Sequence, residues 1–345
     1  MRVLVAMSGG VDSSVAAALL QRAGHDVVGA TMKLWAGASD SGCCSVADVD
    51  DARRVAQQLG IAHHIFNFTE DFDRHVVDPY VADHAAGRTP NPCVSCNRHL
   101  KFDRFLRRAS ALGFDAIATG HHARIVESGG RWRLVRGADR AKDQSYVLYM
   151  LTQAELARTL LPVGELTKPE VRALAAQLGL RTAGKPDSQD VCFITRSGGR
   201  EAFLGDRIPL HPARLVDLVS GEEMGKVPAV ELVTVGQRRG IGDPQAGGAR
   251  RYAVHVDVAG ATVTVGTLAD LMDDHLTLSD MSWVDQPLAI GTTVTVQTSA
   301  HGRPGGGVFA GAGEVHLAEA VRRVAAGQSV VLYDGDEVTG GGIVA

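Results

Sequence analysis

The first 22 residues combine a strand, a glycine turn and a helix, and this order constrains the fold more than any other feature of the chain. The apolar run Val3–Met7 predicts a buried strand, and Ser8–Ser14, with the sequence SGGVDSS, follows it directly. The pattern of Ser13–Arg22 predicts an amphipathic helix. Small residues leave backbone N–H groups accessible at the start of this helix, where the helix dipole also favours an anion. The segment therefore predicts a phosphate-binding loop, distinct from the P-loop of kinases because no lysine follows its glycines.

Strand and helix patterns alternate over the first 120 residues. The predicted strands are Val27–Lys33, Ile61–Phe66 and Ala116–Thr119, and the predicted helices are Ser45–Leu59 and Phe102–Leu112. This order predicts an α/β fold with an N-terminal doubly wound parallel sheet that has helices on both faces. Ligands bind such sheets at the carboxyl ends of the strands, so the SGGVDSS loop should meet the segments that carry Met32 and Gly120.

The pattern changes in the second half of the chain. Helical spacing continues over Thr152–Leu161 and Lys168–Leu178, whereas short alternating segments dominate after about residue 200. We expect three domains: a catalytic domain over residues 1–198, a small β-rich central domain over 199–268 and a C-terminal β-barrel over 269–345. The glycine-rich segment Gly302–Gly313 predicts a mobile loop.

Composition places the protein among globular chains with a proper core. Hydrophobic residues make up 45% and charged residues 21% of the 345 residues. No apolar run is long enough to span a membrane, and the N-terminus lacks the pattern of a secretory signal. We therefore expect a cytoplasmic protein with no membrane partner.

Positive charge is concentrated between Arg98 and Lys142, although the whole chain has a formal net charge of −4. This stretch holds 11 Lys or Arg but 4 Asp or Glu. Such an excess suits the phosphates of a nucleic acid. A solvated helix face followed by a basic hairpin over Arg131–Arg140 explains the charge equally well.

Three cysteines stand out by their sequence context. Cys93 and Cys96 lie in TPNPCVSCN, a segment stiffened by two prolines, and Cys192 lies in KPDSQDVCF. The nearby Arg98 and Lys101 would favour the thiolate of Cys96. A single CxxC is compatible with a redox pair, half of a metal site or chance, and structural zinc is disfavoured because a second pair is missing. The adjacent Cys43 and Cys44 are expected to be small buried residues.

The SGGVDSS loop resembles the pyrophosphate loop of the N-type ATP pyrophosphatases, which cleave ATP between the α and β phosphates. Further motifs extend this likeness along nearly the whole chain, which resembles the bacterial tRNA-specific 2-thiouridylases. These motifs are TPNPxxxCN, KFD, ATGHH, KDQSYVLY, GELTKPEVR, DSQDVCFI, GQRRGIG and GQSVVLYDGDEVTGGGI. The resemblance implies ATP-dependent transfer of sulfur from a protein persulfide to C2 of the wobble uridine of tRNA.

The resemblance also implies roles for individual residues. ATP would be bound by Ala6, Met7, Ser8, Gly9, Gly10, Val11, Asp12, Ser13, Met32 and Gly120, with Mg²⁺ held by Asp12. Cys96 would be the nucleophile and Cys192 the persulfide carrier, with a transient disulfide between them. The anticodon loop of tRNA would contact Asn91, Pro92, Cys93, His121, Lys142, Asp143, Gln144 and Gln328. The implied protein partner is a cysteine desulfurase or sulfur-relay protein.

Two departures from the family pattern bear on the chemistry. Many relatives have aspartate in place of Cys93, and three cysteines (Cys93, Cys96 and Cys192) could hold an iron–sulfur cluster of the 4Fe–4S type with one open iron. The barrel segment Ser299–Gly313 also has few cations with which to grip RNA. An amide- or guanidine-forming synthetase would use the same loop without a cysteine pair, and a non-catalytic RNA-binding protein would not need the loop.

Overall fold

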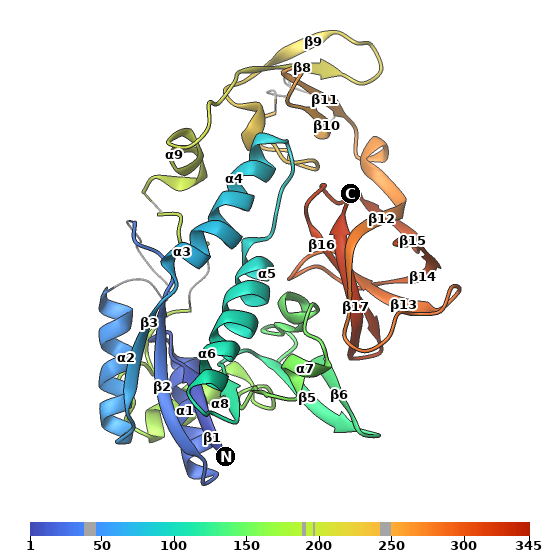
Figure 1. The fold of residues 1–345 in the computed structure, drawn as a ribbon. Coiled ribbons are helices and arrows are strands. Elements are labelled where there is room, and N and C mark those ends of the chain that lie inside the picture. Colours follow the sequence, from blue (N-terminus) through green and yellow to red (C-terminus); the bar gives the residue numbers. More distant parts are fainter. Residues whose placement is uncertain (38–45, 188–190, 196, 242–249) are drawn as a thin grey trace.

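The computed structural model describes residues 1–37, 46–187, 191–195, 197–241 and 250–345 (Figure 1). The expectation for Cys43 and Cys44 lies outside the described residues. No helix in the described ranges is long and apolar enough to cross a membrane.

A five-stranded parallel sheet forms the N-terminal part and confirms the predicted α/β fold. Its order is β3-β2-β1-β4-β7, with β1 at Arg2–Ala6, β2 at Asp26–Lys33, β3 at His63–Asn67, β4 at Ala116–Ala118 and β7 at Thr159–Leu160. Alternate residues of β1 face opposite cores. Val3 and Val5 pack with α1 (Val11–Arg22), α2 (Val46–Leu59) and α8 (Lys168–Gln177), whereas Leu4 packs in a larger cluster on the other face. Burial on both faces explains the continuous apolar run of this strand.

The other face is covered by two helical stretches that have wider, π-helical turns. The first comprises α3 (Thr69–Phe72), η1 (Asp73–Val77) and α4 (Asp78–Ala85). The second comprises α5 (Pro92–Cys96), η2 (Asn97–Arg104) and α6 (Phe105–Ala111). The helix predicted over Phe102–Leu112 therefore begins ten residues earlier, at Pro92, and includes both cysteines of the CxxC.

The region Thr152–Leu161 was predicted to be helical throughout, and this is wrong. The helix α7 covers only Gln153–Leu156, and β7 then adds the last strand of the parallel sheet beside β4. A strand of two residues has no measurable alternation, so the helical spacing before it dominated the pattern.

A four-stranded sheet follows α9 (Gly199–Gly205), in the order β10-β11-β8-β9. Its strands are β8 at Ala213–Asp217, β9 at Glu223–Val227, β10 at Tyr252–Asp257 and β11 at Thr262–Gly266. Three short 3₁₀ helices connect elements in this and other parts of the chain: η3 at Ser145–Leu148, η4 at Val230–Leu232 and η5 at Ala269–Leu271.

Six C-terminal strands form the predicted barrel, which closes because β12 pairs with both β15 and β17. The strands are β12 at Met272–Trp283, β13 at Thr293–Gln297, β14 at Gly305–Gly311, β15 at Glu314–Arg322, β16 at Ser329–Asp334 and β17 at Glu337–Val344. The mobile loop predicted over Gly302–Gly313 is therefore wrong, since most of it is β14. A Cβ on Gly307 would lie 2.9 Å from the His316 carbonyl oxygen, so the glycine permits close approach of β15.

A hairpin from the N-terminal half completes the barrel sheet at one side. It consists of β5 (Ala123–Ser128) and β6 (Arg131–Arg136), and Val135 of β6 pairs with Glu337 of β17. Figure 1 shows this green hairpin directly beside the red strands of the barrel. The bounds predicted for the basic hairpin, Arg131–Arg140, are wrong, because Arg131–Arg136 is only its second strand and Ala123–Ser128 is the first. The hairpin joins two parts of the chain that are far apart in the sequence.

Candidate active site

The SGGVDSS loop makes a tight turn from β1 into α1. Gly9 has a positive φ of 73°, and a Cβ at this position would overlap the backbone of Asp48. Gly10 is the N-cap of α1, and the Ser8 amide donates to Ser13 Oγ at 3.2 Å. The first N–H groups of α1 have no partners within the helix, as at any helix start. The loop therefore has the backbone geometry that phosphate binding requires.

The other predicted nucleotide positions lie at the same edge of the sheet. Met32 is the penultimate residue of β2, the strand beside β1, and its side chain is buried. Gly120 follows β4, and a Cβ there would lie 2.6 Å from the Ser13 backbone nitrogen. The structure brings these segments together at the carboxyl ends of three neighbouring strands. Their part in ATP binding stays a prediction.

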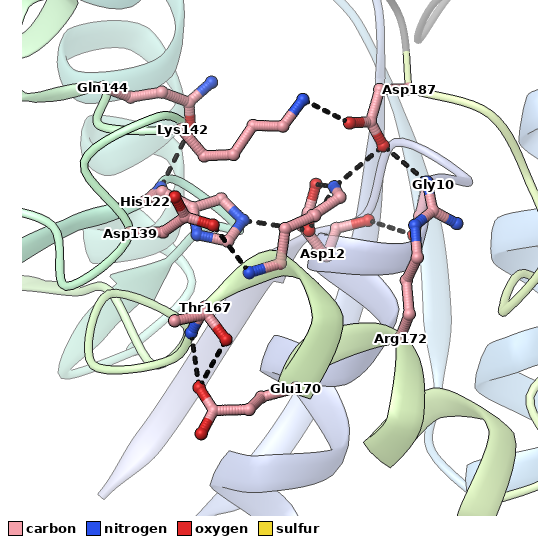
Figure 2. A network of polar contacts seen from close by, with 12 residues as sticks. Gly10, Asp12, His122, Asp139, Lys142, Gln144, Thr167, Glu170, Arg172 and Asp187 are labelled. Carbon is pink, nitrogen blue, oxygen red and sulfur yellow. Dashed lines mark hydrogen bonds and ion pairs between the residues drawn. The ribbon is translucent and has the colours of Figure 1, made fainter.

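Asp12 is the centre of a partly buried ion-pair network (Figure 2). Its two carboxylate oxygens accept hydrogen bonds from Lys168 Nζ at 2.8 and 2.7 Å, and His122 Nε2 lies 3.1 Å from Oδ1. Burial acts to raise the pKa of Asp12, but the bonds to His122 and Lys168 outweigh it and the pKa lies below its usual value. Mg²⁺ at Asp12 stays a prediction, and its binding requires the pair with Lys168 to open.

A second carboxylate, Asp187, is surrounded by three cations. It accepts from Lys142 at 2.8 Å and Arg172 at 2.7 Å, and Lys168 Nζ lies 2.9 Å away (Figure 2). Burial opposes ionisation of Asp187, yet the hydrogen bonds from Lys142 and Lys168 lower its pKa to about 2. Asp187 is therefore ionised at neutral pH and neutralised by its neighbours.

Lys185 ties the same segment to the phosphate loop itself. Its Nζ donates to the Gly9 carbonyl oxygen at 2.9 Å and pairs with Asp51 of α2 at 2.7 Å. Asp48 is a further partner at 2.5 Å. Lys185 and Asp187 thus connect their part of the chain to the phosphate loop, α2 and α8.

The three cysteines differ in exposure. Cys96 is 7% exposed and belongs to the large apolar cluster on one face of the sheet, and Cys192, which is half-buried, packs against the same cluster. Cys93 is exposed, one turn before Cys96 on α5. Within the described ranges, no group of three or more His, Cys, Asp or Glu side chains is placed to hold a metal ion. The described residues therefore do not form a preorganised cluster site.

Aromatic rings fix the segment that carries Cys192. Phe193 is 2% exposed, and its ring lies 5.6 Å from that of Phe72, 5.4 Å from that of Tyr80 and 5.1 Å from that of Phe203. A cleft of about 520 Å³ adjoins this packing, between the segments of the two cysteine motifs. Its lining includes Tyr80, His84, Thr89, Pro90, Pro92, Val191, Ile194 and Arg200.

The residues predicted to contact RNA make bonds within the protein. Asn91 caps α5 by accepting from the Cys93 amide at 3.1 Å, and Pro92 is buried at the first turn. His121 is buried, which lowers its pKa well below the usual value, and its Nδ1 lies 2.7 Å from Thr119 Oγ1. Their contact with RNA stays a prediction.

The remaining predicted RNA contacts also have intramolecular partners. Asp143 accepts from Arg136 at 2.9 Å, and Gln144 Oε1 accepts from the His122 amide at 2.9 Å. The Gln328 amide donates to the Thr89 carbonyl oxygen, so the barrel holds the loop that precedes Cys93. Lys142, as described, pairs with Asp187.

Acids that lie mostly outside the basic stretch 98–142 form ion pairs with many of its cations. Ion pairs join Arg104 to Asp71, Arg107 to Asp103, Arg124 to Glu165, Arg131 to Asp285, Arg133 to Glu337, Arg136 to Asp143, Arg140 to Asp336 and Lys142 to Asp187. Several of these pairs join the basic hairpin to the barrel. The local charge excess in the sequence is therefore largely balanced by ion pairs within the protein, many of them at the surface.

Comparison with known proteins decides the family. A model described as tRNA methyl transferase HUP domain matches residues 1–196, and one described as aminomethyltransferase beta-barrel domain matches residues 273–344. The tRNA-specific 2-thiouridylase MnmA of Chloroflexus aurantiacus is 46% identical, over 99% of this chain and 98% of that protein. The MnmA of Mycobacteroides abscessus is 45% identical, over 100% and 99%. This chain belongs to the tRNA-specific 2-thiouridylase family.

The thiouridylase motif GELTKPEVR contains residues whose roles the sequence did not reveal. Thr167 and Glu170 form a capping box at the start of α8, and Pro169 lies in its first turn (Figure 2). Lys168 and Arg172 then reach Asp12 and Asp187. The only signal was the pair of cations that follow the cap, Lys168 and Arg172, which also fits an ordinary solvated helix.

Proposed function

We propose that this protein is a tRNA 2-thiouridylase, which exchanges the C2 oxygen of the wobble uridine for sulfur. ATP adenylates that oxygen and pyrophosphate leaves, so a poor leaving group becomes AMP. The observation that best supports the proposal is that Lys185 and Asp187, which precede Cys192 in the sequence, bond to the Gly9 carbonyl oxygen and to Lys168, respectively. We infer from it that Cys192 and the adenylating loop serve one site.

The sulfur step uses the two cysteines in sequence. The terminal sulfur of a Cys192 persulfide attacks C2, and AMP leaves with the oxygen. Cys96 then attacks the Cys192 sulfur, the persulfide S–S bond breaks, and its electron pair remains on the sulfur now bound to C2. The products are 2-thiouridine and a Cys96–Cys192 disulfide, which an external thiol must reduce before the next turnover.

The nucleotide roles follow from the loop geometry. Residues 6–13 supply backbone donors to the phosphates, Met32 contacts the nucleotide, and Gly120 lies close to the start of α1. Mg²⁺, when bound, neutralises phosphate charge. Because Lys168 already bonds both Asp12 oxygens, no step is assigned to a metal at Asp12.

The substrate is tRNA, whose anticodon loop presents a base that can be flipped at low cost. We assign the approach of the target base to Asn91, Pro92 and Cys93, since Cys93 is exposed beside the cleft. His121, Lys142–Gln144 and Gln328 are assigned to the surrounding RNA contacts, which for Lys142 requires release from Asp187.

The cellular context follows from the chemistry. A persulfide on Cys192 needs a donor, so we propose a cysteine desulfurase or sulfur-relay protein as partner and the cytoplasm as the compartment. We retain the division into residues 1–198, 199–268 and 269–345.

A 4Fe–4S cluster on Cys93, Cys96 and Cys192 is the alternative sulfur carrier. In the described ranges these cysteines do not form a metal-binding group, so the proposed sulfur step uses the persulfide. Iron analysis and visible absorbance of anaerobically purified protein decide between the two carriers.

AMP formation tests the proposed class of reaction. We expect wild-type protein to form AMP and pyrophosphate from ATP only when unmodified tRNA is present. A binding protein would form no AMP, and an amide- or guanidine-forming synthetase would not need tRNA and would keep its activity in Cys192→Ser.

A further inference from the structure

Lys168 bridges the phosphate loop and the segment that leads to Cys192. Its side chain is 10% exposed, and its ammonium group bonds Asp12 at 2.8 and 2.7 Å and lies 2.9 Å from Asp187. An ammonium group has three N–H donors, so these contacts occupy all of them. Lys168 is thus held in place, with its charge directed at the first turn of α1.

The surrounding cluster brings cations and carboxylates together at the start of α1. Its cations are Lys142, Lys168 and Arg172, and its carboxylates are Asp12, Asp187 and Asp139, which accepts a hydrogen bond from the Lys168 amide at 2.9 Å. The formal charges balance, and the dipole of α1 adds a positive potential at its N-terminus. An anion that takes the place of one carboxylate therefore meets cations that are already in position.

We propose that Lys168 is the residue that binds the leaving pyrophosphate, and that Asp187 competes with pyrophosphate for it. This rests on the proposed adenylation. The uridine oxygen forms a bond to the α-phosphorus of ATP, and the bond from that phosphorus to the α–β bridging oxygen breaks. The electron pair leaves on pyrophosphate, whose growing negative charge is stabilised by the nearby ammonium group.

Asp187 is the partner that Lys168 can exchange. After losing Lys168, Asp187 still has Lys142 at 2.8 Å and Arg172 at 2.7 Å. Asp12 relies on Lys168 and His122, so losing Lys168 would leave a largely buried carboxylate poorly compensated. Pyrophosphate therefore replaces Asp187 at Lys168 while the bonds to Asp12 remain.

Calorimetric titration with inorganic pyrophosphate and with AMP, at fixed Mg²⁺, tests the proposal. We expect Lys168→Met to weaken pyrophosphate binding by about tenfold or more, since a charge-assisted bond is lost, and to change AMP binding by less than about twofold. Asp187→Asn removes the competitor and should tighten pyrophosphate binding by about threefold. Lys226→Met, which removes an exposed lysine on β9, is the matched control for charge and should change neither affinity.

A purely structural Lys168 predicts different results. Lys168→Met and Asp187→Asn would then both weaken pyrophosphate and AMP together. Such a parallel loss of both affinities overturns the proposal. An unchanged pyrophosphate affinity in Lys168→Met, or a weakened pyrophosphate affinity in Asp187→Asn, also overturns it. If Lys168→Met does not fold, Lys168→Arg should retain pyrophosphate binding, and the sign of the Asp187→Asn effect decides. Wild-type protein that binds neither ligand would instead refute the nucleotide site itself.

Discussion

The phosphate-loop end of the site is held by charged side chains, whereas the cysteine end is held by aromatic ones. Asp12, Lys168 and Asp187 form a network of ion pairs around α1, while Phe193 packs among the rings of Phe72, Tyr80 and Phe203. The ion pairs can exchange partners with a polyphosphate, as proposed for Lys168 and Asp187. The aromatic rings hold Phe193, the neighbour of the half-buried Cys192, in a fixed position. Lys185 and Asp187 belong to the first environment, and Phe193 belongs to the second.

The largest expected effect is the loss of sulfur transfer at the cysteine end, with nucleotide binding at the phosphate-loop end unchanged. Cys192→Ser should lower 2-thiouridine formation by roughly a thousandfold or more, because no sulfur carrier remains, while leaving ATP affinity unchanged. Nucleoside mass spectrometry and ATP titration measure the two quantities. Cys93→Ser removes a thiol but no persulfide carrier, so it should retain clearly more activity than Cys192→Ser if the carrier is a persulfide. Wild-type thiolation by Cys192→Ser would show that the cysteine end is assigned incorrectly.

Gly120→Ala should weaken ATP binding at the phosphate-loop end. Its Cβ would lie 2.6 Å from the Ser13 nitrogen, so the start of α1 must shift, and we expect ATP binding to weaken by roughly 10- to 100-fold. Gly184→Ala is a suitable control because no atom lies within 4 Å of the added Cβ. Equal ATP affinities for the two variants would argue against close packing of Gly120 on the loop.

Acid should remove the stability contributions of His84, at the cysteine end, and of Asp187, at the phosphate-loop end, in different pH ranges. Burial lowers the pKa of His84, which lines the cleft, from 6.5 to about 4. The unfolded chain then binds a proton that the folded protein does not, so stability falls as the pH drops from 6.5 to 4, by about 2–3 kcal/mol at most. The contribution of Asp187 is complete above its unfolded pKa of 3.8 and is lost as the pH falls toward 2.

Urea midpoints measured from pH 7 to pH 3 check this order. His84→Asn should reduce the slope above pH 4 without abolishing it, because the buried His121 also has a lowered pKa, and Asp187→Asn should leave that slope intact. An unchanged slope in His84→Asn would assign the acid sensitivity to other groups.

Gln328→Ala should have the smallest effect. Loss of its bond to the Thr89 carbonyl oxygen should cost about 1 kcal/mol of stability and slightly loosen the loop before Cys93. Thermal unfolding and tRNA binding are measured in parallel, with Gln297→Ala in the same barrel as a comparison. Weaker tRNA binding at unchanged stability would favour a direct RNA contact instead.

The fold was largely predictable because its signals are local. The buried run of β1 and the glycine turn identified the parallel sheet and its ligand-binding edge. The errors at β7 and β14 have a physical cause, since a two-residue strand lacks periodicity and glycines can serve close strand packing as well as mobility.

The candidate site was only half predictable. Gly9, Gly10 and Asp12 follow each other in the sequence, so their motif is visible. Lys168 pairs with Asp12 across 156 residues of chain and Asp187 pairs with Lys142 across 45, and no local pattern reports such pairs. The basic stretch illustrates the same limit, because its neutralising acids lie in α3, the barrel and other distant segments.

The most direct measurement combines the two ends of the site in one reaction. Unmodified tRNA is incubated with the protein, Mg²⁺, ATP and a persulfide source, and the tRNA and nucleotides are analysed by mass spectrometry. The account predicts replacement of one oxygen by sulfur at the wobble uridine, with one AMP and one pyrophosphate for each 2-thiouridine formed. Absence of this mass gain, or sulfur incorporation without AMP, would contradict it.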